Sequence, residues 1–390
     1  MDMTRLRVIH VVMVLLIAYV RSEDGPHSDA DHWNDHMEAD TREWCSSVQS
    51  TPEPSLVFYN RIPKCASSTM QLLFKEIAHH HKHSKKSNPS PTKAIYAAST
   101  HRPLWSNHPS PQLQQDLYNF VNSELTSPNE SLLVFDGHIG YFPFNTSLLH
   151  QSSQLSNALE LEFTNVIRQC GPRQQSSFYY KLFDSVTSRQ AQRKNQLSSH
   201  LRIILGLNDT EDADNCLRNE ICLRRALNPS TKASSISNFM GDCSRNQGCD
   251  ESDSLILQQP DYDKHSELIM QREVSSVLNN IKANSGVYKS FGLTEYLTQY
   301  LEMLECVYPS MRGIVQAHET TTSKNVHTDE IIRHPDTTRI ISQIFAEKCH
   351  DSPDSRLYAL MNTTFWSRYH AMKSKPGRCC RGHETSNKKR

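Results

Sequence analysis

A single lysine stands among small and hydroxyl residues in a turn between an apolar run and an amphipathic segment. The turn holds Lys64, Cys65, Ala66, Ser67, Ser68 and Thr69. Residues 56–59 before it read as a buried strand, and the apolar residues of 70–77 recur at the spacing of one helix face. A helix that begins near Ser67 aims unpaired N–H groups at the turn. The segment therefore predicts a phosphate-binding loop.

The absence of glycine from this turn separates it from the common nucleotide-binding loops. A Walker A loop requires G-x-x-x-x-G-K-[ST], and a protein kinase requires H-R-D and D-F-G segments. The chain contains none of these strings. A nucleotide-dependent kinase of the secretory pathway is therefore only a weak alternative.

A histidine follows a second apolar run, in the string Leu132-Leu-Val-Phe-Asp-Gly-His138. The carboxyl end of a buried strand is where open α/β sheets bind their ligands. The pKa of a histidine suits proton removal from a sugar hydroxyl near neutral pH. From its position alone, His138 is either a structural histidine or a candidate general base. Asp136, two residues earlier, adds a carboxylate at the end of the same apolar run.

A third group of polar residues follows the apolar run 163–167. Arg168 ends this run, and Ser176 stands eight residues later at the start of an aromatic helical segment. A guanidinium and a hydroxyl in this arrangement can bind one phosphate group. Arg168 and Ser176 are therefore predicted to form a second phosphate site.

The elements that must position these residues alternate between strand and helix. Residues 132–135, 163–167 and 287–291 read as buried strands, and the last of these lies between helical patterns over 268–281 and 296–307. Such alternation predicts an α/β fold in which helices wrap a parallel sheet and ligands bind at the carboxyl ends of the strands.

The three polar segments together resemble the Golgi family of uronyl and heparan sulfate 2-O-sulfotransferases. Residues 59–68, YNRIPKCASS, are similar to its 5′-phosphosulfate loop, and residues 137–141, GHIGY, to its G-H-V-x-F segment. Residues 168–179 resemble its 3′-phosphate site, in which an arginine, a second arginine (here Arg173), a serine and paired aromatic residues recur. Gln-Cys at 169–170 replaces the family's Asp-Pro.

The resemblance implies a P-loop-like sulfotransferase fold with a central parallel sheet flanked by helices. It implies transfer of sulfate from 3′-phosphoadenosine 5′-phosphosulfate (PAPS) to the 2-O position of a uronic acid in a glycosaminoglycan such as heparan, dermatan or chondroitin sulfate. Residues 64–69 then bind the 5′-phosphosulfate, and Arg168 and Ser176 bind the 3′-phosphate. Lys64 stabilises charge on the leaving nucleotide, while His138 is the catalytic base.

Four basic residues are candidates for binding the acceptor polysaccharide. Arg61 is a candidate for the acceptor's carboxylate or sulfate, and three later basic residues, Arg189, Arg193 and Lys194, are either polysaccharide contacts or solvated surface charges. Neither a metal nor a nucleic acid is expected, and relatives suggest a homotrimer. The departures at Asp136 and Gln169 leave open a catalytically impaired paralogue that acts as a glycan-binding protein.

The ends of the 390-residue chain differ in composition from its middle. Two arginines followed by a short apolar stretch predict a signal peptide or signal anchor over 1–22. The acidic segment 23–54 is predicted to be a flexible stem, 55–374 a sulfotransferase domain, and 375–390 a basic tail. The formal net charge is zero, so a polyanionic partner must be held by local basic patches.

Eleven cysteines and four N-glycosylation sequons indicate an oxidising secretory compartment. The sequons begin at Asn129, Asn145, Asn208 and Asn362. Close spacing predicts small disulfide loops for Cys216–Cys222 and Cys243–Cys249, and the second also resembles the family's C-x5-C pair. Cys65 is the cysteine predicted to stay free. We expect a Golgi lumenal protein that is either a type II membrane protein or secreted.

Overall fold

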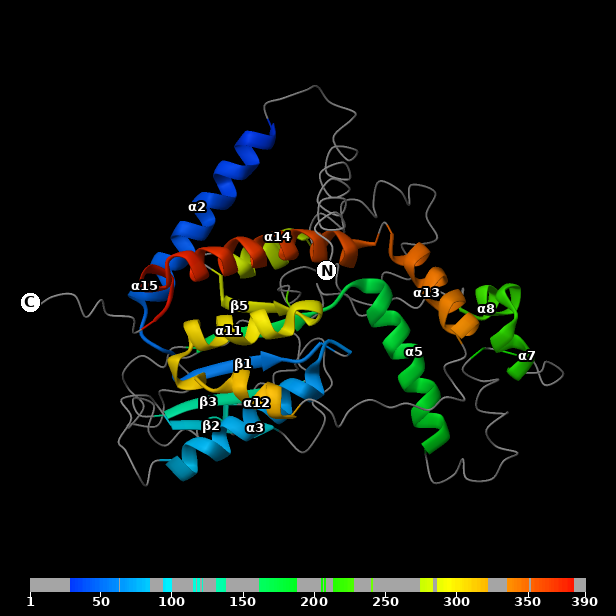
Figure 1. The fold of residues 1–390 in the computed structure, drawn as a ribbon, viewed down its shortest axis with the longest axis horizontal. Coiled ribbons are helices and arrows are strands. Elements are labelled where there is room, and N and C mark those ends of the chain that lie inside the picture. The colour runs from blue at the N-terminus through cyan, green and yellow to red at the C-terminus, as the bar shows by residue number, and fades with distance from the viewer. Residues whose placement is uncertain are drawn as a thin grey trace, which may run out of the picture.

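The computed structural model describes residues 29–62, 64–84, 94–99, 115–116, 118–119, 121, 131–137, 161–187, 205, 207, 213–227, 240, 274–282, 286–321, 335–350 and 352–381 (Figure 1). The predicted signal segment 1–22 lies outside these residues.

Five parallel strands form one central sheet. They are β1 (Leu56–Asn60), β2 (Ala94–Ser99), β3 (Ser131–Gly137), β4 (Leu161–Ile167) and β5 (Tyr288–Leu293). Their order across the sheet is β2-β3-β1-β4-β5, and every neighbouring pair is parallel. The predicted α/β architecture, a parallel sheet flanked by helices, is therefore confirmed.

The middle of the sheet is buried on both faces, which is why its strands read as nearly continuous apolar runs. All five residues of β1 are buried. The ring of Phe58 lies between those of Phe135 on β3 and Phe163 on β4, with centroid distances of 4.5 and 5.4 Å. These ring contacts join the three central strands into one core.

Helices α3 (Ser67–Ser84), α12 (Ile314–Thr321) and α11 (Leu297–Val307) pack side by side, with α3 against β2 and α11 against β5. They cover one face of the sheet (Figure 1). The buried residues of α3 include Met70, Leu73, Phe74 and Ile77, the stripe that its sequence predicts. Short 3₁₀ helices, η3 (Thr294–Tyr296) and η4 (Pro309–Met311), flank α11, and residues 274–281 form a further helix.

A second group of helices packs around a smaller apolar cluster of its own. It comprises α5 (Cys170–Thr187), α7 (Ala213–Arg218), α8 (Glu220–Ala226) and α13 (Pro335–Cys349), which lie to one side of the sheet in Figure 1. The Cys216–Cys222 disulfide joins α7 to α8, as predicted. The Cys170–Cys349 disulfide, which the sequence analysis did not anticipate, ties the start of α5 to the end of α13.

The predictions of a flexible stem over 23–54 and a separate basic tail over 375–390 are wrong for the described parts of both segments. Helix α2 (Asp29–Ser50) places the side chain of Trp44 in the core, where its indole N–H donates to the carbonyl of Lys289 at 2.7 Å. Helix α15 (Pro376–Cys379) follows α14 (Pro353–Ser374), and Arg381 is buried in an ion pair with Glu162.

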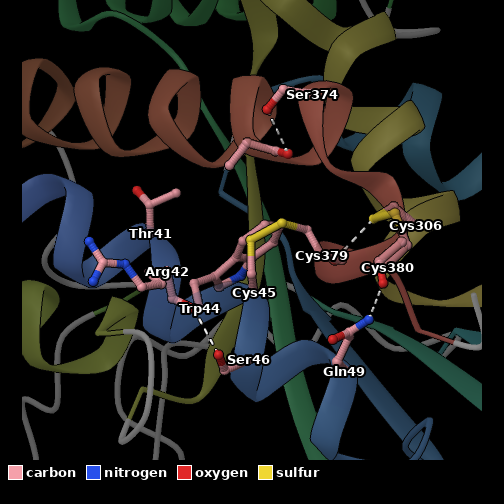
Figure 2. The surroundings of a disulfide bond; sticks show 12 residues. Thr41, Arg42, Trp44, Cys45, Ser46, Gln49, Cys306, Ser374, Cys379 and Cys380 are labelled. Atoms are coloured by element: carbon pink, nitrogen blue, oxygen red, sulfur yellow. Dashed lines mark hydrogen bonds between the residues drawn. A yellow bond between two sulfur atoms is a disulfide. The ribbon is translucent and has the colours of Figure 1, made fainter.

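Two disulfides fasten both segments to the domain. Figure 2 shows the Cys45–Cys379 bond between α2 and α15, and the neighbouring Cys380 bonds to Cys306 on α11. The amide of Gln49 also donates to the carbonyl of Gly377 (Figure 2). The stem prediction failed because α2 is mostly polar in sequence. Its few core residues are recognisable only from their tertiary contacts.

The predictions of N-glycosylation and of the Cys243–Cys249 disulfide remain predictions. Asn362 is half-buried in the middle of α14, whereas the asparagines of the other three sequons lie outside the described residues. Cys243 and Cys249 also lie outside them. None of the described helices is both long and apolar enough to cross a bilayer.

Candidate active site

The candidate site lies where the connections from two neighbouring strands leave the sheet in opposite directions. Strands β1 and β4 are adjacent, but the chain after β1 leads through α3 to β2, and the chain after β4 leads through α5 to β5. In open α/β sheets such a switch point opens a crevice outside the carboxyl ends of the strands. The predicted loop after β1 and Arg168 after β4 therefore lie on the two sides of this switch point.

The loop between β1 and α3 has a backbone conformation suited to binding an anion. Lys64 and Ala66 both have positive φ, 66° and 55°, whereas Cys65 between them does not. Positive φ is uncommon in residues other than glycine, and it costs energy that the surrounding structure must supply. Alternation of this kind turns successive N–H groups toward one concave side, which is an anion-binding nest. The Met70 N–H donates to the Ala66 carbonyl at 3.0 Å and begins α3.

The side chains of the loop differ in what they offer a ligand. Ser68 is exposed, Thr69 is half-buried and Ser67 is buried. Cys65 is fully buried and is a free thiol, as predicted. Burial raises the pKa of Cys65 to about 12, so this thiol stays neutral. We therefore assign Cys65 a packing role, and its N–H donates within the loop to the Ile62 carbonyl at 3.3 Å.

Arg168 and Lys64 bring the two predicted phosphate sites together. The Nη1 atom of Arg168 approaches the Lys64 carbonyl at 3.5 Å, the long end of hydrogen-bonding distance. The Nζ atom of Lys64 lies 3.0 Å from the ring centroid of Tyr180 on α5. Ser176 is half-buried on the same helix. Three of the predicted residues thus come from elements that meet at the switch point.

The second arginine of the resemblance has a different role. Arg173 is 4% exposed and forms an ion pair with Asp354 in the first turn of α14. This pair ties α5 to α14.

Gln169 anchors the turn between β4 and α5 through its backbone. Its N–H donates to Oε1 of Glu295 at 3.3 Å, while the Tyr358 hydroxyl donates to Oε2 of the same carboxylate at 2.9 Å. The family's aspartate is absent at this position, but the turn that carries Arg168 is still tied to both η3 and α14.

Arg61 and Asp136 form an ion pair across β1 and β3. The Nε–Oδ1 distance is 3.1 Å, and the side chains are 16% and 5% exposed. Burial raises the pKa of Asp136 to about 6, although Arg61, Lys75 and Gln71 oppose the rise. Arg61, which was predicted to contact the acceptor, therefore already has an anionic partner.

A buried polar network, which was not predicted from the sequence, joins three neighbouring strands. Asn165 on β4 donates its Nδ2–H to Oδ1 of Asn60 at 3.0 Å, and Asn60 donates to the Tyr288 hydroxyl at 2.6 Å. These bonds join β1, β4 and β5 close to the strand ends that Arg61 and Arg168 follow. An asparagine at the last position of a buried apolar run was the available signal, since a buried amide requires partners.

Several predicted residues cannot be placed. His138, Arg189, Arg193 and Lys194 lie outside the described residues, although β3 ends at Gly137 beside Asn60, on the same edge as the loop. Within the described part of the chain, no group of three or more His, Cys, Asp or Glu side chains could hold a metal ion. No protein-family model matches the chain, and no curated protein sequence matches it significantly.

Proposed function

We propose that the protein transfers sulfate from PAPS to the 2-O position of a uronic acid in a glycosaminoglycan, in the Golgi lumen. The observation that carries this proposal is the pairing of a loop with positive φ at Lys64 and Ala66 after β1 with Arg168 after β4, across the switch point of a parallel sheet. A loop of this kind and a guanidinium on the two sides of one switch point suit a ligand with two separated anionic groups. PAPS has this chemistry, since its phosphosulfate and its phosphate are attached to the 5′ and 3′ positions of the same ribose.

The proposed roles follow from these positions. The N–H groups of the loop and the hydroxyls of Ser68 and Thr69 bind the phosphosulfate, and Arg168 with Ser176 binds the 3′-phosphate. The acceptor hydroxyl gives its proton to His138 as its oxygen forms a bond to sulfur. The bond from sulfur to the phosphate oxygen breaks at the same time, and Lys64 stabilises the negative charge that appears on that oxygen. The products are the sulfated sugar and adenosine 3′,5′-bisphosphate.

The decisive experiment is incubation of the purified full chain with radiolabelled PAPS and a panel of desulfated glycosaminoglycans, followed by disaccharide analysis. We expect label on the 2-O position of uronic acid residues. Lys64→Ala should abolish this labelling, whereas Lys375→Ala, which removes an exposed lysine after α14, should leave it unchanged. Equal activity in both variants would remove Lys64 from the mechanism.

A second candidate, a catalytically impaired paralogue that binds glycans, is favoured by one observation. Arg173 of the 3′-phosphate motif is committed to Asp354, so one cation of that motif does not reach a ligand. Calorimetry with adenosine 3′,5′-bisphosphate separates the candidates. Tight nucleotide binding without transfer to any acceptor supports the impaired paralogue, and tight binding with transfer supports the enzyme.

A further inference from the structure

The ion pair between Arg61 and Asp136 lowers the net positive charge at the carboxyl ends of β1 and β3. Arg61 directly follows β1, and Asp136 is the penultimate residue of β3. With side chains only 16% and 5% exposed, the two charges attract one another with less screening than an exposed pair. Arg61 therefore offers an incoming anion much less than a full positive charge.

The sheet register places this pair at the end of β3 that precedes the proposed base in the sequence. Asn60, which precedes Arg61, lies opposite Gly137, the residue immediately before His138. A general base must come within hydrogen-bonding reach of the hydroxyl that it deprotonates. An acceptor sugar bound for this reaction consequently passes close to the carboxyl end of β3, where Asp136 and Arg61 meet.

Three other side chains act on Asp136. From α3, the exposed Lys75 ammonium and Gln71 both act to lower the pKa of Asp136 and so favour its charged form. On β1, burial, then Tyr300, then the Asp136 charge raise the pKa of the Tyr59 hydroxyl, which therefore stays neutral beside the carboxylate. Because burial raises the pKa of Asp136 only to about 6, the carboxylate is ionised at pH 7.5 and keeps Arg61 neutralised.

We propose that Asp136 is a specificity-determining residue that neutralises Arg61 and so selects acceptor stretches of low charge density, which carry uronic carboxylates but no sulfate groups. This inference rests on the proposed function and names the class of acceptor for the same site. A densely sulfated chain gains nothing from Arg61 and is repelled by any charge on Asp136 that remains uncompensated.

The test measures equilibrium binding of the purified full chain at pH 7.5 to two probes, heparin and chemically desulfated heparin. Asp136→Asn should tighten binding of the sulfated probe about tenfold, because one unneutralised cation then faces a dense row of anions. Binding of the desulfated probe should change by less than about threefold, since fewer of its anions reach Arg61. Asp136→Ser, which removes the same carboxylate with a smaller side chain, must give the same shift.

Two further variants control for charge and for the identity of the cation. Glu347→Gln removes a carboxylate from the exposed Arg224–Glu347 pair between α8 and α13, and it should change neither affinity. Arg61→Gln combined with Asp136→Asn removes both charges, so its affinity for the sulfated probe should return to that of wild type. Retention of the tenfold gain in this double variant would show that Arg61 is not the cation involved and would overturn the proposal.

An equal gain for both probes, no gain for either, or the same gain in Glu347→Gln would also overturn it. Sulfate transfer by the same variants separates this inference from the proposed function. A shifted binding preference without transfer to any acceptor refutes the enzyme but leaves charge selection by Asp136 intact. Transfer that favours desulfated acceptors equally in wild type and Asp136→Asn refutes charge selection and leaves the enzyme intact.

Discussion

The Lys64 ammonium lies 3.0 Å from the centroid of the Tyr180 ring, although the two residues come from opposite sides of the switch point. Lys64 precedes α3, whereas Tyr180 lies in the middle of α5 and is 52% exposed. A cation over an aromatic face gains about 0.5–1 kcal/mol at an exposed site. In the absence of donor, the ring therefore holds the lysine that the proposed chemistry requires.

Tyr180→Leu should consequently tighten binding of adenosine 3′,5′-bisphosphate, because the nucleotide no longer competes with the ring for Lys64. The loss of about 0.5–1 kcal/mol from the free state corresponds to an affinity gain of about two- to fivefold. Tyr180→Phe keeps the aromatic face and serves as the matched control. Calorimetry decides the matter, since weaker binding by Tyr180→Leu would mean that the ring orients the lysine toward the ligand.

His138→Ala should abolish sulfate transfer while leaving nucleotide affinity nearly unchanged, because the proposed base meets the acceptor and not the donor. A lost general base costs about 10²-fold or more in rate. Labelled transfer and calorimetry on one preparation measure both properties. A variant that retains more than about a tenth of wild-type turnover contradicts the assignment.

Arg168→Ala should weaken nucleotide binding by about 1.5–3 kcal/mol, the scale of a hydrogen bond to a charged group. The preference for adenosine 3′,5′-bisphosphate over adenosine 5′-monophosphate should disappear with it. The matched control is Arg378→Ala, an exposed arginine on α15. Unchanged discrimination between the two nucleotides would place the 3′-phosphate site elsewhere.

Asp136→Asn should stabilise the fold at alkaline pH. The pKa of this buried carboxyl is raised from 3.8 to about 6, so the folded state holds the proton more tightly than the unfolded state. The stability that this proton contributes is complete below pH 4 and is lost as the pH rises to 6. The difference corresponds to about 3 kcal/mol. Denaturant titrations should therefore find the variant more stable than wild type at pH 8 and equal to it near pH 4, and a constant difference at all pH values would contradict this account.

Replacing both Cys45 and Cys379 by alanine should destabilise the protein more than replacing Cys216 and Cys222. The first disulfide closes a sequence separation of 334 residues and the second one of 6. In the loop-entropy model these bonds are worth about 6 and about 2 kcal/mol. Unfolding in denaturant measures both losses, and the opposite ranking would mean that α2 packs firmly without its covalent bond.

The parts of the site that could be predicted are those encoded within short stretches of sequence. The strand, loop and helix around Lys64 follow from local apolar spacing, and so do the positions of β3 and β4. The pairs Arg61–Asp136 and Arg173–Asp354 could not be predicted, because each joins residues far apart in the sequence. Identical arginines on neighbouring elements can bind a ligand or a buried carboxylate, and only the tertiary fold decides between them.

The same limit explains the errors at the two ends of the chain. Polar composition predicted a stem and a tail, whereas Trp44 in the first segment and Arg381 in the second are both buried. Strand β2 was missed as well, and it lies at the edge of the sheet beside β3. Composition reports the average environment of a segment, and a few core residues are enough to fold it into the domain.

The adjacent cysteines 379 and 380, bonded to Cys45 and Cys306, give the chain the covalent topology of a closed ring. A protease that cuts once anywhere between Cys45 and Cys379 opens the ring but releases no fragment, since the pieces stay joined through sulfur. Nicked molecules therefore migrate as intact chains on a non-reducing gel and separate only after reduction. Removing residues 1–54, as one would remove a stem, would cut the ring and leave Cys379 unpaired.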